Sequence, residues 1–118
     1  MTMDTYDIDF LAEQLKREVT SLVLSVQVEK KLDQNCYLRL IDVLKNITVT
    51  LKDVECVPKS MLLNIHVAIN SIINDRPYLS EGEVIFSETV VSIFNKYFYY
   101  ILTNETYDER VPGVPRIF

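Results

Sequence analysis

Apolar residues recur at steps of three and four along four separate segments of this chain. In the first segment, from about residue 7, they are Ile8, Leu11, Leu15, Val19, Leu22 and Val26. This spacing puts one side chain per turn on the same side of an α-helix, so it predicts an amphipathic helix with one buried face. Residues 22–28 also alternate with period two and are rich in β-branched residues, which leaves a strand there as the alternative.

Two further helices are predicted between Asp33 and residue 74. Asp33 is a suitable N-cap for the first of them. Its apolar positions are Tyr37, Leu40, Leu44, Ile47, Leu51 and Val54. The β-branched residues 48–50 weaken its middle, so a kink or an early end near Ile47 is the alternative. Pro58 ends this helix and begins the next one. The apolar stripe of that third helix consists of Met61, Leu62, Ile65, Ala68, Ile69, Ile72 and Ile73.

A fourth helix is predicted from Ser80 to about Leu102, after a turn at residues 74–77. Ser80 and Glu83 match a capping box, in which Ser80 accepts from the Glu83 amide and the Glu83 side chain reaches back to the Ser80 amide. Apolar residues occupy two adjoining sides of this helix: Val84, Val91, Phe94, Phe98 and Ile101 on one, and Phe86, Val90, Ile93, Tyr97 and Tyr100 on the next. So much apolar circumference predicts that this is the central helix.

Together these segments predict an all-α fold, a compact bundle of four to five helices with an extended, Pro-containing C-terminal tail. The 118 residues fit one domain spanning residues 1–118, of which residues 104–118 are expected to be largely irregular. Two prolines with a glycine between them in the last residues favour an extended or turn-containing tail. Only 2 Gly and 4 Pro interrupt the chain, so it has the composition of a folded protein.

The sequence offers no recognisable catalytic, cofactor or metal site. Gly82 and Gly113 are the only glycines, and neither lies in a phosphate-binding loop. Cys36, Cys56 and His66 lack the paired short spacings of a zinc site, and the two cysteines are expected to be free thiols. His66 is expected at the edge of the core with hydrogen-bonded nitrogens. The protein is therefore predicted not to be an enzyme; a nucleophile–base pair of Cys56 and His66 is the alternative.

Charge narrows the classes of partner. Seventeen acidic and twelve basic residues give a net charge of −5, which disfavours nucleic-acid binding and favours a basic protein partner. The longest uncharged run, residues 60–74, is shorter than the roughly 20 residues that span a bilayer, so no membrane span is predicted. Asp4, Asp7 and Asp9 stand where a secretory signal would carry basic residues, so a cytoplasmic protein is expected.

A tyrosine and nearby carboxylates form the predicted partner-binding surface. Tyr99 shares a helix face with Glu88 and polar residues, so it is expected to be exposed. Tyrosine is enriched at the energetic centres of interfaces. The candidate partner-binding residues, expected near one acidic end of the molecule, are Glu81, Glu88, Tyr99, Tyr107, Asp108 and Glu109.

These features favour an acidic inhibitor that binds and neutralises a basic partner enzyme, such as a nuclease toxin. The expected fold, the size and the charge resemble the general character of bacterial immunity proteins, without a shared motif. The alternative is a helical adaptor or regulatory subunit that binds a partner helix in an apolar groove. No cofactor is expected in either case, and the sequence leaves the oligomeric state open.

Overall fold

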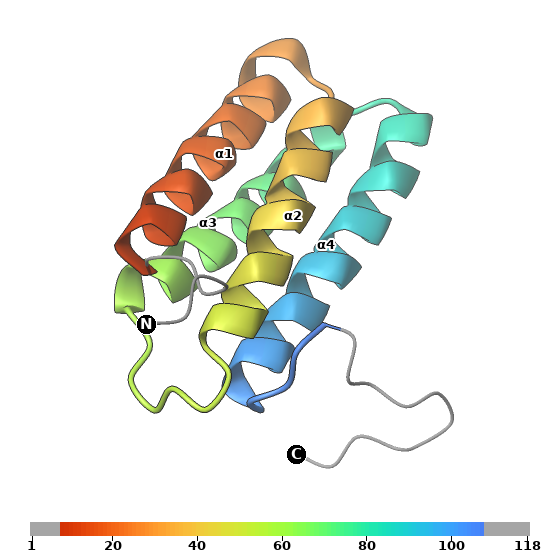
Figure 1. Ribbon diagram of the computed structural model, residues 1–118. Helices are drawn as coiled ribbons and strands as arrows, with labels where there is room; N and C mark the ends of the chain where they lie inside the picture. The colour runs from red at the N-terminus through yellow and green to blue at the C-terminus, as the bar shows by residue number, and fades with distance from the viewer. Residues whose placement is uncertain (1–7, 108–118) are drawn as a thin grey trace, which may run out of the picture.

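The computed structural model describes residues 8–107, which form four α-helices and one short 3-10 helix. The helices are α1 (Ile8–Glu29), α2 (Gln34–Thr50), α3 (Lys59–Asp75) and α4 (Glu81–Leu102), with η1 (Arg76–Tyr78) between α3 and α4. They run alternately up and down (Figure 1). No strand occurs among the described residues, so the predicted all-α bundle is confirmed. Residues 104–107 are non-helical, as expected, and the rest of the expected tail lies outside the described residues.

Where the sequence allowed either a helix or another structure, the chain forms the helix that the spacing of three and four residues predicts. In α1, Leu22 and Val26 are fully buried, whereas the alternating neighbours Leu24 and Val28 are 52% and 73% exposed. Residues 22–28 therefore do not bury every second side chain, as a strand would, and they belong to the helix. α2 likewise continues past Ile47 to Thr50. The next residues depart from the prediction, because Val54 lies beyond the helix and is 44% exposed.

The predicted helix caps are present, with one change. Asp33 Oδ1 accepts from the Cys36 amide at 3.1 Å, and Ser80 Oγ accepts from the Glu83 amide at 3.3 Å. The second half of the predicted capping box is wrong: Glu83 Oε1 accepts from the Leu32 amide at 2.8 Å instead. The α1–α2 loop lies against the start of α4, and Leu32 of this loop is buried there. Its backbone amide is therefore shielded from water and needs an acceptor within the protein.

α1 packs against α2 and α3, and α4 packs against the same two helices, so the bundle has no central helix. The prediction that α4 is central is therefore wrong. One side of α4 faces the core, where Phe94 is buried. Apolar residues beyond that side stay outside: Ile85 is 66% and Leu102 is 55% exposed. The wide apolar circumference of α4 is thus only partly used for folding, which leaves it available for contacts with another molecule.

Candidate protein-binding surface

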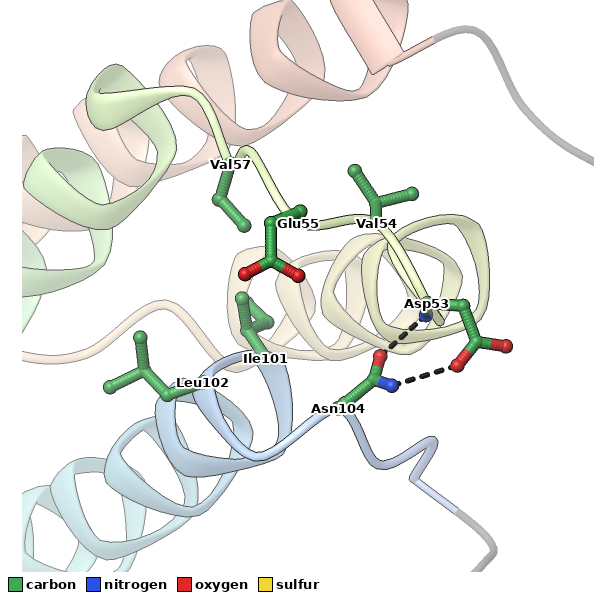
Figure 2. A pocket seen from close by; sticks show the side chains of 7 residues that line it. All are labelled: Asp53, Val54, Glu55, Val57, Ile101, Leu102 and Asn104. Carbon is green, nitrogen blue, oxygen red and sulfur yellow. Dashed lines mark hydrogen bonds between the residues drawn. The ribbon is translucent and has the colours of Figure 1, made fainter.

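A hollow lies at the end of the bundle where α2 and α4 end and α3 begins, which we call the α2–α3 end. Its volume is about 330 Å³. The lining residues come from the α2–α3 loop and from the last turn and exit of α4 (Figure 2): Asp53, Val54, Glu55, Val57, Ile101, Leu102 and Asn104. Carboxylates and apolar side chains therefore share one concave surface.

A pair of hydrogen bonds fixes the loop against the exit of α4. Asn104 Oδ1 accepts from the Asp53 amide, and Asn104 Nδ2 donates to Asp53 Oδ1 at 2.8 Å. Lys52 Nζ adds a bond to the Asn104 carbonyl oxygen at 3.0 Å. Asp53 and Asn104 have φ values of 65° and 61°, a left-handed conformation that Asp and Asn adopt more readily than most residues. Asp53 and Asn104 therefore fix the wall of the hollow through their hydrogen bonds, and both residue types suit the left-handed backbone found there.

Glu55 is the carboxylate that remains available in the hollow. Its side chain extends from the loop toward α4, whereas the Asp53 carboxylate turns to Asn104 (Figure 2). Within residues 8–107, Glu55 has no hydrogen-bond or ion-pair partner. The negative ends of α2 and α4 point to the same end of the bundle, and neither helix has a basic residue in its last turn. Helix C-termini carry partial negative charge, but α1 and α3 begin at this end with the opposite partial charge, so the carboxylates of the hollow, and not the helix ends, favour a cation here.

The lining of the hollow suits a lysine or arginine side chain. The stem of such a side chain is aliphatic and packs on apolar surface, while its head seeks a carboxylate. Val54, Val57 and Leu102 provide the apolar surface, and Glu55 provides the carboxylate. An arginine can also make two parallel hydrogen bonds to one carboxylate.

Tyr99 is exposed, as the sequence predicted, with 46% of the residue accessible. Leu102, which lines the hollow, follows three residues later and therefore lies beside Tyr99 on the helix surface. Tyr107 is 40% exposed but lies against α2. The Lys45 ammonium is 5.4 Å from the centre of its ring, and the Tyr107 amide donates to Thr48 Oγ1 at 3.3 Å. Both tyrosines thus belong to the α2–α3 end, Tyr99 on α4 and Tyr107 in the segment after α4, where it packs against α2.

The predicted carboxylates are spread along α4. Glu81 is the first residue of α4, so about 27 Å of helix axis separates it from Tyr99 at about 1.5 Å per residue. Glu88 lies about 16 Å from Tyr99 along the same axis. The expectation that all candidates share one end is therefore wrong for Glu81, because residues on one helix face can lie at opposite ends of a long helix. Asp108 and Glu109 lie outside the described residues.

Asp53, Glu55 and Leu102 were not predicted from the sequence as binding residues. The available signal was the acidic–apolar–acidic run Asp53, Val54 and Glu55, between the end of one helix and Pro58. Their relation to α4 could not be seen in the sequence, since about 50 residues separate them from Leu102.

The residues considered for catalysis lie in different settings. Cys36 is buried, and its Sγ donates to the Glu18 carbonyl oxygen at 3.1 Å. Burial, followed by the nearby Glu18, raises the pKa of Cys36 to about 12. Cys56 is exposed in the α2–α3 loop, and both cysteines are free thiols. His66 is exposed on α3 rather than at the edge of the core, and its Nε2 accepts from Asn70 Nδ2 at 2.8 Å.

Within residues 8–107, no three His, Cys, Asp or Glu side chains are grouped closely enough to hold a metal ion. None of the described helices is long and apolar enough to cross a bilayer. No protein-family profile, curated protein or solved structure matches this chain. Its function must therefore be inferred from its own surface.

Proposed function

We propose that this protein binds a basic partner protein and inhibits it, and that the contact is made at the α2–α3 end. The observation that carries the proposal is the hollow of about 330 Å³ in which Glu55, without an internal partner, stands among apolar side chains. A lysine or arginine of the partner would bring its charge to Glu55 and its stem to Val54 and Leu102.

The surroundings of the hollow support an interface larger than one side chain. Tyr99 and Leu102 extend it along α4, and a large, rigid tyrosine side chain is a common energetic centre of such contacts. Tyr107, which follows α4 and packs against α2, flanks the same end. Glu88 lies within the span of a typical interface of about 800 Å² per partner, whereas Glu81 lies at its far limit. We therefore assign Tyr99 and Glu55 the central role and Glu88 a role at the rim.

The net charge of −5 supports the same class of partner. Opposite net charges accelerate the encounter of two proteins, and this acceleration weakens as salt rises. The alternative function, an adaptor that holds a partner helix in an apolar groove, fits the hollow less well. A groove for an apolar helix would not place carboxylates on its wall, because a carboxylate covered without a partner costs free energy.

A titration with a small cationic probe tests the hollow directly. N-acetyl-arginine amide should shift the backbone amide resonances of residues 53–57 and 101–104, because the guanidinium binds Glu55. N-acetyl-citrulline amide, which has nearly the same shape without the charge, should shift them much less. Glu55→Gln should remove the difference between the two probes, and Glu81→Gln should preserve it. Equal responses to both probes in the unmodified protein would contradict the proposed site.

Partner capture tests the function itself. The immobilised protein and its variants Glu55→Lys and Glu81→Lys would be exposed to extracts of the source cells, and captured proteins would be identified. A basic protein should bind the unmodified chain and Glu81→Lys, but bind Glu55→Lys at least about tenfold more weakly. Its own activity should fall when the unmodified chain is added in equal amount. A captured partner that remains fully active would exclude inhibition while leaving the binding site intact.

A further inference from the structure

The outer face of α3 differs from the outer faces of the other helices because it has no charged side chain between Lys59 and Asp75. Its exposed apolar residues are Leu63, Val67 and Ile73, which are 60%, 38% and 41% accessible. The other helices expose charged residues in mid-helix: Glu13, Lys16 and Arg17 on α1, Arg39 and Asp42 on α2, and Glu88 and Lys96 on α4. Solvent-facing helix surfaces are usually polar and charged, and depletion of charge marks the cores of interfaces.

Four of the exposed residues of this face form a pattern that reads the same in both directions. Leu63, His66, Asn70 and Ile73 follow one another at steps of three, four and three. The midpoint between Leu63 and Ile73 is also the midpoint between His66 and Asn70, and it falls at residue 68. A twofold axis beside this point would place a second, antiparallel α3 with Leu63 opposite Ile73 and His66 opposite Asn70. Val67 would lie next to the axis.

The two polar residues at the centre are complementary to their own copies. His66 Nε2 and Asn70 Nδ2 are within hydrogen-bond distance at 2.8 Å, and the amide nitrogen is the donor in the tautomer that has its proton on Nδ1. Each chain therefore presents one donor, His66 Nδ1, and one acceptor, Asn70 Oδ1, on an exposed face. Around the twofold axis, the donor of each copy faces the acceptor of the other. Both central polar groups could then be hydrogen-bonded in the pair, as covered polar groups require.

We propose that a second copy of this chain covers the outer face of α3, forming an antiparallel twofold dimer centred at residue 68. Charge opposes a second copy least at this face, because chains with a net charge of −5 repel each other most where carboxylates meet. Here none meet in the middle. At each edge, the antiparallel arrangement brings Lys59 of one copy within about one turn of Asp75 of the other.

The size of the face sets the strength of this dimer. α3 has 17 residues and is therefore about 25 Å long, so a single helix pair covers less than the roughly 1,200 Å² of a standard interface. We expect a dissociation constant in the micromolar range. The dimer lies apart from the hollow at the α2–α3 end and does not depend on the proposed partner.

Sedimentation velocity over a wide concentration series of the full chain tests the dimer. The unmodified protein should change from monomer to dimer between roughly 1 µM and 1 mM. Leu63→Glu should raise the dissociation constant by about tenfold or more, because the twofold axis places two new carboxylates in the interface. Leu38→Glu is a matched control, since Leu38 on α2 is 59% exposed and Leu63 is 60% exposed. Circular dichroism and thermal melting establish that both variants fold.

Cross-linking tests the antiparallel register. In a Cys56→Ser background, Leu63→Cys and Ile73→Cys chains should form a disulfide when mixed and oxidised, because the two positions face each other across the axis. Leu63→Cys alone should cross-link poorly, since its two copies are about 15 Å apart along the helices. Cys36 should not interfere, because it is buried.

Three results would overturn the proposal. The first is an unmodified protein that stays monomeric throughout the series, which would leave the face to a different partner. The second is equal weakening by Leu63→Glu and Leu38→Glu, which would place the contact elsewhere. The third is efficient cross-linking of Leu63→Cys with itself, which would show a different register.

Discussion

The two ends of the bundle each have a hollow with carboxylates in its lining, and they differ in how those carboxylates are used. At the opposite end, where α1 and α3 end and α2 and α4 begin and which we call the α1–α2 end, a hollow of about 380 Å³ includes Glu83. Glu83 Oε1 accepts from the Leu32 amide at 2.8 Å. At the α2–α3 end, the hollow includes Glu55, which has no partner among the described residues. The first carboxylate joins α4 to the α1–α2 loop, and the second makes no contribution to folding that the structure shows.

Other polar groups near the α1–α2 end are also hydrogen-bonded within the protein. Arg76 Nε donates to Ser87 Oγ at 2.9 Å, and Ser87 Oγ donates to the Val84 carbonyl oxygen at 2.6 Å. Ser87 is completely buried, so its hydroxyl requires these partners. The comparison separates carboxylates that maintain the fold from a carboxylate that is available to another molecule.

The largest expected difference is in thiol reactivity. Cys36, near the start of α2, is buried and hydrogen-bonded to Glu18, whereas Cys56 is exposed in the α2–α3 loop. A thiol reagent should modify Cys56 readily and Cys36 at least about 100-fold more slowly, because Cys36 reacts only after local opening. Counting modified thiols over time, with and without denaturant, measures both rates. Two equally fast thiols would show that the α1–α2 packing opens easily.

Alkaline pH should destabilise the fold through Cys36. The pKa of this thiol rises from 9.0 to about 12 on folding, because of burial and then Glu18. Above pH 9 the unfolded chain loses this proton while the folded chain keeps it, so the free energy of unfolding falls as pH rises toward 12. The melting temperature should fall by about 5 °C or more over this range. Cys56→Ala should keep this slope, and Cys36→Ala should reduce it; equal slopes in both variants would contradict the assignment.

The two carboxylates should differ clearly in their effect on stability. Glu83→Ala should lower the free energy of unfolding by about 2 kcal/mol, because it leaves the Leu32 amide without its acceptor. Glu55→Ala should change it by less than about 0.5 kcal/mol, as expected for an exposed residue without a partner. Urea unfolding of both variants provides the measurement. Similar losses would mean that Glu55 also supports the fold, which would remove its role as an available carboxylate.

Asn104 should make a smaller contribution at the α2–α3 end. Asn104→Ala removes the bonds to Asp53 and places alanine at a φ of 61°, so a loss of about 1.5 kcal/mol is expected. Asn104→Gly should recover part of this loss, because glycine adopts that φ without strain. Equal stabilities of the alanine and glycine variants would show that the hydrogen bonds, and not the backbone, account for the effect.

The smallest expected effect is a gain at the α1–α2 end. Lys30 follows the end of α1 with a φ of 60°, which glycine tolerates better. Its exposed Nζ donates to the Gln27 carbonyl oxygen at 2.7 Å and lies 5.5 Å from the centre of the Tyr78 ring, so Lys30→Gly should stabilise the fold by no more than about 0.5 kcal/mol. Asp53 has a similar φ of 65°, but its side chain binds Asn104. Asp53→Gly should therefore bring little or no gain. Thermal melting of the two variants compares the ends; a clear gain from Asp53→Gly would mean that its bond to Asn104 is weak.

The sequence by itself determined the helices and two of their N-caps, Asp33 and Ser80. Apolar spacing is a local property that a helix repeats every turn, and Ser80 caps the helix through an amide only three residues away. The same reasoning correctly predicted that Tyr99 is exposed and that the cysteines are free. It also showed that α4 is apolar over much of its circumference.

Only the tertiary structure decided which polar groups pair and which surfaces meet. Glu83 bonds to an amide 51 residues away, and Asp53 to a side chain 51 residues away. α4 lies at a corner of the bundle and not in its centre, because four helices of similar length bury each other's stripes pairwise. The packing of α2 against α4 also brings the α2–α3 loop beside the end of α4, so Glu55 and Leu102 line one hollow. Helical spacing fixes which face of a helix is buried, but the neighbours of that face depend on how the connecting loops direct the chain.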